Sequence, residues 1–349
     1  MSVEIRKIRG PLTEEQLGWI TSLYGPVDPK YGSLDFVRHQ FVGNPYGWSA
    51  HAFALTEEGP VAHVGVVPFH ARLGSQPLAA GKIEAVVVAE SHRGGRTESG
   101  GSIAVETMSA AYALAHESGI PMLFGLAPPR VAAVHARAGC KRVTVEAPTH
   151  IFVGQPLAAA RDWSPRRKAA AVCLSLAQNT VLGLLYVATR PVAGRRLRIE
   201  PLRPDDADLA VASVGDGEWT VSGFDAWDWY AGSGALHAIE IGGPFGSRAI
   251  VRLGARGSSL EIVAWRPRRT GLVPGLLLLV ALARIARRNS APTLRFQPWP
   301  GQGGNGALAR ACRTLGLVQR RETELVLHVE DPELASADVQ LTPFFHVTF

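Results

Sequence analysis

The chain has 349 residues, of which 46% are hydrophobic and 19% are charged, and its formal net charge is +6. This composition excludes a disordered chain, and the length favours two domains over a single core. The basic residues are spread along the chain and match no nucleic-acid-binding motif, so solvated surface is their expected role and no nucleic-acid partner is expected.

Three cysteines, Cys140, Cys173 and Cys312, lie far apart in the sequence. Their number and spacing predict neither a disulfide framework nor a zinc site, so no metal is expected. Residues 1–10 contain no apolar segment typical of a signal peptide. A cytoplasmic location is therefore the default expectation.

The first third of the chain predicts an α+β arrangement. Alternation over 3–8 indicates an edge strand, and Thr13 followed by Gln16 is a capping-box pattern that opens a helix through Leu23. A second helix is expected over 33–41, where glycine and proline at 43–47 end it. Three antiparallel strands are then expected over 50–55, 61–73 and 78–89.

The segment 83–139 carries the strongest functional signal. A β-branched apolar run is followed by a loop rich in glycine and arginine, a helix that starts near Ser102, a strand over 122–126 and a short helix that ends at Gly139. Backbone N–H groups at a helix start, beside arginines, suit a pyrophosphate. Many α/β proteins have such turns and bind nothing there, so the loop alone leaves both interpretations open.

An apolar helix is predicted over 169–188. It has the length of a membrane-spanning segment and is flanked by basic residues. However, Gln178 and Asn179 lie at its centre, and small alanines dominate it. A helix that links two domains fits better, and membrane contact is not expected.

After residue 197 the chain repeats the order of its first part. Strands are expected over 237–241, 247–253, 260–265, 293–297 and 323–329, and a leucine-rich helix over 272–288. Residues 266–271 stand in the place of the glycine and arginine loop. A repeat of about 150 residues indicates duplication of one fold.

In this order of elements the chain resembles the tandem form of the GNAT acyltransferase superfamily. The matching loop is 93–101, which opens with Arg93-Gly94 and ends with Gly100-Gly101 but carries a short insertion relative to the family pattern. Residues 43–47, the Val61-Ala62-His63 segment and Pro68 resemble the branch that includes amino-sugar N-acyltransferases.

The resemblance implies two tandem GNAT-like domains, each a mixed, mostly antiparallel sheet flanked by helices. Residues 1–154 would bind acetyl-CoA or another acyl-CoA, 155–196 would form the linker with its apolar helix, and 197–349 would be a degenerate copy that shapes the acceptor pocket. The residues expected to bind the cofactor are Val86, Val88, Arg93, Gly94, Gly95, Arg96, Gly100, Gly101 and Ser102.

Three residues are candidates for the chemistry of acyl transfer to an amine. His135 lies four residues before Gly139, where many family members have the tyrosine that protonates the departing thiolate, and an imidazolium can do the same. Glu84 is expected to share a face with Val86 and Val88, where apolar neighbours would raise the pKa of a general base. His63 is expected to line the cleft, on resemblance. A surface histidine and an edge or dimer-contact glutamate are the plainer alternatives.

The leading hypothesis is an acyl-CoA-dependent N-acyltransferase that acts on a small-molecule amine, such as an amino sugar or a nucleotide-linked amino sugar. A transferase that takes an aminoacyl group from tRNA and a non-catalytic binding or scaffold protein are the alternatives. Asp225 and Asp228, among aromatic residues, could hold a sugar or an amine, or could face solvent. A homodimer is left open.

Overall fold

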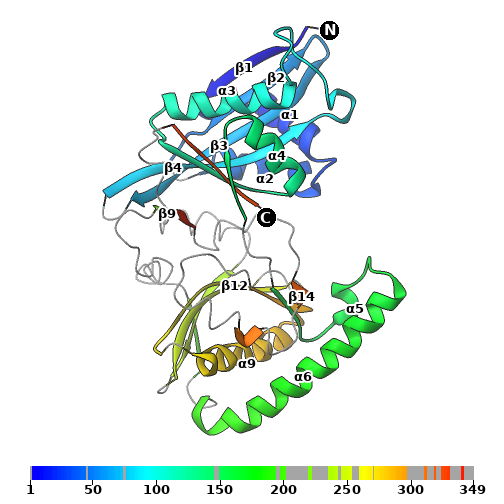
Figure 1. The fold of residues 1–349 in the computed structure, drawn as a ribbon, viewed down its shortest axis with the longest axis vertical. Helices are drawn as coiled ribbons and strands as arrows, with labels where there is room; N and C mark the ends of the chain where they lie inside the picture. The colour runs from blue at the N-terminus through cyan, green and yellow to red at the C-terminus, as the bar shows by residue number, and fades with distance from the viewer. Residues whose placement is uncertain are drawn as a thin grey trace.

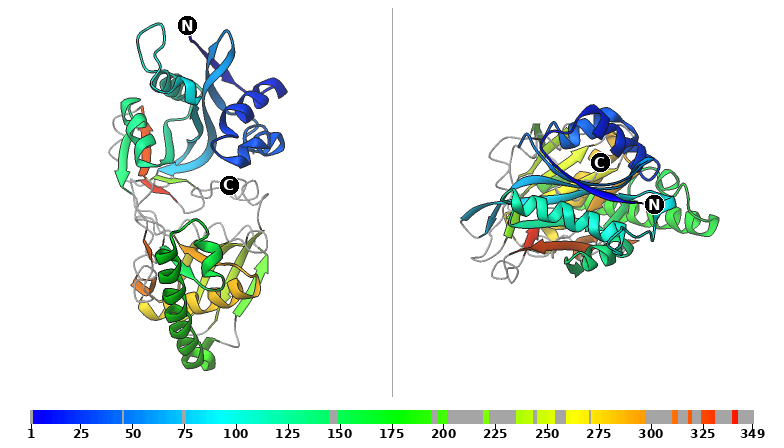
Figure 2. Two further views of the ribbon diagram at one scale, coloured as in Figure 1. Left: turned by 90° about the vertical axis from the view of Figure 1, so that its right-hand side faces the viewer. Right: turned by 90° about the horizontal axis from the view of Figure 1, so that it is seen from above.

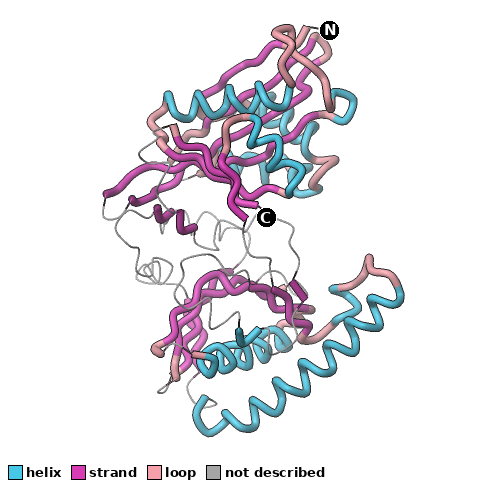
Figure 3. The backbone as a smooth tube through the Cα atoms, in the orientation of Figure 1, coloured by secondary structure: helices cyan, strands magenta, loops and turns pink. Residues whose placement is uncertain are grey.

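The computed structural model describes residues 2–44, 46–73, 76–144, 149–193, 197–201, 219–221, 235–242, 245–253, 259–269, 271–296, 310–312, 318–319, 324–330 and 339–341. These residues form two mixed β-sheets, which lie at opposite ends of the molecule (Figure 1). Helices cover both sheets, as Figure 3 shows. The predicted α+β class, with two units that each carry a mixed sheet, is confirmed.

The first sheet has seven strands along its main path, and all neighbours on this path are antiparallel except β4 and β5. In spatial order these are β1 (Glu4–Arg9), β2 (Ala50–Thr56), β3 (Gly59–Leu73), β4 (Gln76–Val88), β5 (Met122–Ala127), β15 (Glu324–Val329) and β6 (Lys141–Thr144). Two short strands, β9 (Trp219–Val221) and β16 (Val339–Leu341), extend it beside β3.

Helices cover the two faces of this sheet (Figure 2). One face carries α1 (Glu14–Tyr24), the 3₁₀ turn η1 (Pro29–Gly32) and α2 (Leu34–Phe41), and the other carries α3 (Ile103–Glu117) and α4 (Pro129–Arg137). The alternation of β2 explains the division, because Phe53 packs with the α1 side while Ala50 and Ala52 pack with the α3 side. The capping box of α1 is present, with Thr13 and Gln16 each bonding the other's backbone.

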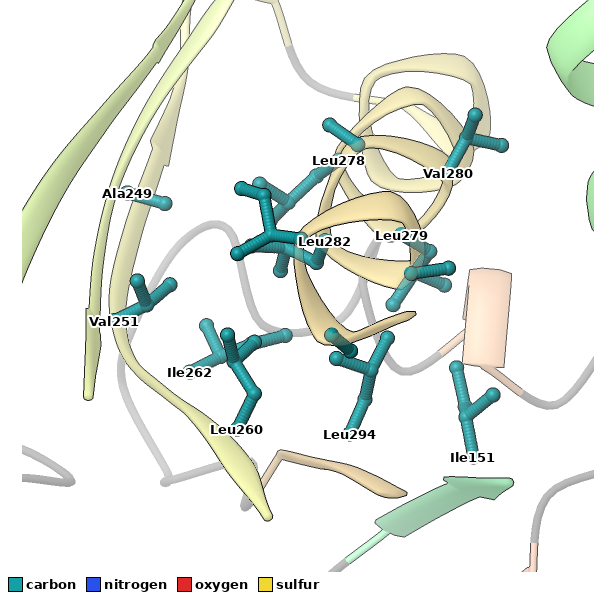
Figure 4. Packing of buried hydrophobic residues seen from close by; sticks show 14 of the residues in the cluster. Ile151, Ala249, Val251, Leu260, Ile262, Leu278, Leu279, Val280, Leu282 and Leu294 are labelled. Carbon is teal, nitrogen blue, oxygen red and sulfur yellow. The ribbon is translucent and has the colours of Figure 1, made fainter. Parts of the chain in front are cut away.

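The second sheet has the order β14 (Val318–Gln319), β7 (Thr149–Phe152), β13 (Thr293–Phe296), β12 (Leu260–Pro267), β11 (Ser247–Leu253), β10 (Ala235–Ile241) and β8 (Leu197–Pro201). Its core is closed by α9 (Leu272–Arg288), whose leucines point at the sheet (Figure 4). Leu278, Leu279 and Leu282 are fully or almost fully buried there.

The predicted apolar helix is present as α6 (Pro165–Ala193), preceded by the short α5 (Pro156–Ala159). The second half of α6 packs on α9, where Leu182 joins the core of the second sheet. The first half packs on α5 through Ala160 and Ala171. The α6 helix therefore forms an outer layer beyond α9 (Figure 1).

The two halves of the chain exchange strands. β15, from the second half, lies between β5 and β6 of the first sheet, and Arg142 on β6 holds Glu324 on β15 with two hydrogen bonds of 2.6 and 2.8 Å. In return, β7, from the first half, pairs with β13 and β14 of the second sheet. Neither sheet is thus built from one contiguous range, and the ranges 1–154 and 197–349 do not coincide with the sheets. The strand periodicity at 323–329 could not reveal this, because it carries no information about which sheet receives the strand.

Candidate functional site

The central feature of the first sheet is the divergence of β4 from β5. The two strands pair only from Ala80 to Lys82 on β4, and β4 continues to Val88 without β5. In this free part β4 bulges: Glu84 lies opposite Gly65 and Val87 lies opposite His63, so Ala85 and Val86 together face the single residue Val64. Ala85 has a φ of 50°, which is rare for a residue with a Cβ. The bulge thereby directs the strand end beyond it toward a cavity.

That cavity has a volume of about 710 Å³ and lies between the end of β4, the start of α3 and the helix α4. Its apolar wall comes from β3, β4, α3 and α4, and includes Val64, Val86, Val88 and Met108. Its basic residues are Arg93, Arg96, Arg130 and Arg137, together with His92, and no Asp or Glu lines it among the described residues. The cavity therefore combines a long apolar wall with a positively charged margin.

Part of the loop between β4 and α3, residues 97–101, closes on itself outside the cavity. Arg96 forms a β-bridge with Ser102, and the Arg96 guanidinium donates a hydrogen bond of 2.6 Å to the Gly100 carbonyl. At the base of this excursion, the Ile103 N–H donates to the Gly95 carbonyl at 3.2 Å. The insertion inferred from the sequence thus forms a side loop, and Gly95 leads directly to the start of α3.

This geometry divides the residues expected to bind a cofactor into two groups. Seven of them line the cavity, namely Val86, Val88, Arg93, Gly94, Gly95, Arg96 and Ser102. Gly100 and Gly101 do not, since both lie in the side loop, where Ser99 donates a short hydrogen bond to Glu106.

Two positions in the loop require glycine. Gly94 has a φ of +81°, a conformation that residues with side chains rarely adopt. At Gly95, a Cβ would lie 2.9 Å from both the His92 carbonyl oxygen and the Ile103 side chain. A side chain at either position would therefore disturb the loop conformation that leads to α3.

Arg130 and Arg137, for which the sequence favours a solvated position over contact with coenzyme phosphates, also line the cavity. They lie seven residues apart on α4, and therefore on one face of that helix together with Val134. This spacing was the available sequence signal. The face brings two further cations to the cavity that Arg93 lines.

His63 is fully buried and does not line the cavity, contrary to expectation. Its neighbours on β3, Ala62 and Val64, do line it, so His63 points to the α2 side of the sheet. Its Nδ1–H donates to the Ala85 carbonyl at 3.1 Å. Burial lowers the pKa of His63 to about 3, so the imidazole is neutral at physiological pH.

His51 is a buried partner of His63 that the sequence did not indicate. Because the Nδ1 atom of His63 carries the proton, its Nε2 accepts a hydrogen bond from the His51 Nδ1–H at 3.0 Å. The Ser49 hydroxyl lies within hydrogen-bond distance of both the His51 Nε2, at 2.7 Å, and the Phe41 carbonyl, at 3.0 Å. Burial, together with the charge that His63 would carry, holds the pKa of His51 well below its usual value. A directed chain of hydrogen bonds thus runs from His51 through His63 to the bulge at Ala85.

His135 is also buried away from the cavity. Its Nδ1 is joined to the Tyr112 hydroxyl by a hydrogen bond of 2.5 Å, and only 2% of its surface is exposed. Burial lowers its pKa to about 4, which leaves the imidazole neutral near pH 7. The structure gives His135 neither contact with the cavity nor the charged form that a thiolate acid needs.

Glu84 lies on the opposite face from the cavity as well. Its carboxylate forms a buried ion pair with Lys82 and accepts a hydrogen bond of 3.4 Å from the Tyr31 hydroxyl. The expectation that it shares a face with Val86 and Val88 assumed regular alternation, which the bulge at Ala85 interrupts.

In the second half, the corresponding loop does not approach this cavity. Of its residues, Arg268 contacts Glu240 and Arg269 lies 5.8 Å from the ring of Phe245. Asp225 and Asp228, the candidates for holding an acceptor, lie outside the described residues.

No protein-family model and no curated protein sequence matches the chain. Solved structures do match, and they cover almost its entire length. A tandem GNAT protein from the clavulanic acid biosynthesis pathway, solved without AcCoA, is 13% identical with a TM-score of 0.54 and covers 94% of this chain and 99% of its own. The chain has the tandem GNAT fold.

Two further GNAT structures agree with this fold. A GCN5-related N-acetyltransferase from Anabaena variabilis ATCC 29413 is 13% identical with a TM-score of 0.56 and covers 93% of this chain and 73% of its own. One from Kribbella flavida is 14% identical with a TM-score of 0.52, at 97% and 74% coverage. At such identities the likeness establishes the fold and leaves the chemistry to the site.

Proposed function

We propose that the chain is an acyl-CoA-dependent N-acyltransferase that acts on a small amine. One observation carries the proposal: the apolar wall along the free end of β4 leads to the arginines and glycines at the start of α3. An apolar slot suits the pantetheine arm of coenzyme A, and a basic margin beside a helix N-terminus suits its phosphates. The resemblance in fold to N-acetyltransferases supports the same direction.

In this proposal the chain binds and orients both reactants. Acyl-CoA supplies the activated acyl group as a thioester. Backbone N–H groups near Val88 hold the thioester carbonyl, and Arg93, Arg130 and Arg137 hold the phosphates. The bulge at Ala85, held by His63, fixes the direction of that strand end. Within the proposal the acceptor is a small amine, for which an amino sugar is the specific expectation.

A specific observation favours one alternative, a non-catalytic binding protein. Among the described residues, the candidates for acid and base, His135 and Glu84, both lie away from the cavity. An amine that arrives neutral can attack the thioester directly, with less need of an acid or a base. The cavity then has only to position the two reactants and polarise the carbonyl. Transfer from a charged tRNA stays an untested alternative.

The test separates binding from chemistry. Acetyl-CoA at about 100 times its dissociation constant stabilises the folded state by roughly 2.7 kcal/mol, which a thermal melting curve detects. We expect this shift in the wild type and in the exposed-arginine control Arg6→Ala, and its loss in Arg93→Ala. No shift in the wild type with acetyl-CoA or longer acyl-CoA contradicts the proposal. A shift without thiol release on any amine of a broad panel supports the binding protein.

A further inference from the structure

The α6 helix exposes several large apolar side chains. Its covered face includes the polar residues Ser175 and Gln178, which are only 4% and 1% exposed, beside the buried Leu182. Its outer face holds apolar ones, with Leu176, Leu184 and Val187 exposed at 64%, 68% and 70%. A helix on the surface of a soluble protein normally exposes its polar face to water. The apolar outer face of α6 is therefore suited to an apolar environment.

The covered face is firmly bound to the rest of the molecule. Asn179 accepts a short hydrogen bond from Arg287 of α9, whose guanidinium also donates to the Val153 carbonyl at 3.2 Å. Arg284 lies over the ring of Tyr186 at 4.5 Å. Among the described residues, α6 is the one helix with the length and composition to cross a membrane. Because one side is fixed to α9, however, its free side can only lie along a surface.

Charge indicates which surface. The segment 165–193 contains no Asp or Glu, and three basic residues, Arg166, Arg167 and Lys168, open it. Arg190 near its other end adds a further positive charge. If two copies paired along this face, positive ends would meet whether the helices ran parallel or antiparallel. An anionic lipid leaflet, by contrast, attracts both ends while its acyl region accepts the leucines.

We infer that α6 is a membrane-surface anchor, which lays its outer face on bilayers that contain anionic phospholipid. This proposal departs from the expectation that membrane contact is absent, and it is independent of what the cavity binds. Peripheral attachment leaves the domains in water, with the first sheet at the far end of the molecule from α6 (Figure 2).

Vesicle sedimentation of the full chain tests the inference. With vesicles of phosphatidylcholine and phosphatidylglycerol we expect the wild type in the pellet, and at least about tenfold weaker partition with phosphatidylcholine alone or at high salt. Leu176→Gln combined with Leu184→Gln should weaken partition by at least about tenfold, whereas Leu176→Ile with Leu184→Ile should keep it. A wild type that stays in the supernatant with anionic vesicles overturns the inference.

A second pair of variants tests the charge independently of the leucines. Arg166→Glu with Arg167→Glu should lose binding, while Arg6→Glu with Lys7→Glu, an equal change of net charge on β1, should retain it. Melting temperature and acetyl-CoA-induced stabilisation should be unchanged in the α6 variants, which shows that they fold. If light scattering finds a dimer that only the Gln variant dissociates, and no variant binds vesicles, then a second copy covers the face and the inference is wrong.

Discussion

The Nδ1–H of His63 donates a hydrogen bond of 3.1 Å to the carbonyl of Ala85, the residue at which β4 bulges with a φ of 50°. A buried imidazole on one face of the sheet thereby holds the backbone that shapes the cavity on the other. His63, expected from the sequence to line the cleft, instead acts on the cavity through the strand between them.

Removal of this imidazole should loosen the bulge. In His63→Ala the Ala85 carbonyl and the His51 Nδ1–H both lose a buried partner, which costs about 1–3 kcal/mol each in the free energy of unfolding. Urea unfolding measures the loss, and acetyl-CoA should bind more weakly. The control is His70→Ala on the same strand, which is exposed and should stay near the wild type. Equal stabilities for the two variants would contradict the role given to His63.

Stability should fall below pH 6.5. His63, with a pKa of about 3, and His135, with a pKa of about 4, stay neutral in the folded chain while the unfolded chain takes up protons near pH 6.5. Since the unfolded state then binds more protons, each histidine lowers the free energy of unfolding by about 1.4 kcal/mol for each pH unit between 6.5 and its folded pKa. Above pH 6.5 neither histidine reduces the stability. Urea melts across this range check the slope. His135→Gln should remove the contribution of one histidine from the dependence of the unfolding free energy on pH. An unchanged slope would contradict the burial of a neutral His135.

The side loop should be dispensable for binding. Because Arg96 bridges to Ser102, replacement of 97–101 by a two-residue turn leaves Gly95 against Ile103. We expect the acetyl-CoA affinity to change by less than about threefold, whereas Gly95→Ala, whose Cβ would lie 2.9 Å from backbone oxygen, should lower it at least about tenfold. Calorimetry compares the two. Loss of binding in the shortened loop with Gly95 intact would show that the side loop itself holds the ligand.

The first half should not fold alone. A fragment of residues 1–154 lacks β15, so β5 loses a neighbour and β6 loses its described partner, while β7 has no sheet to join. We expect no cooperative thermal transition from this fragment, in contrast to the full chain. Addition of a second fragment, 155–349, should restore the transition. A cooperative melt of 1–154 by itself would show that the strand exchange is not needed for stability.

Local signals predicted much of the first sheet. The capping box at Thr13, the strand pattern of 50–89 and the glycine at 139 each depend on residues close in sequence, and each gave the correct element. Seven of the nine expected binding residues line the cavity for the same reason.

The failures arose where a local pattern could not determine direction. The spacing from Gly139 gave the position of His135 along α4, but not the side of the helix on which it lies. In the structure Val134 faces the cavity and His135 faces the core. Glu84 was assigned by alternation, which a bulge of one residue reversed. The partners of β7 and β15 are set by packing between distant segments, which no single stretch of sequence records.

The strand exchange also dictates an order of events on the ribosome. The middle of the sheet that forms the cavity remains open until β15, at residues 324–329 of 349, has been translated. Until then the nascent first half carries an unpaired edge at β5, the kind of edge that invites aggregation or capture by chaperones. Premature termination after Arg137 but before β15 therefore yields a chain without the complete cavity-bearing sheet, even though every residue that lines the cavity has already been made.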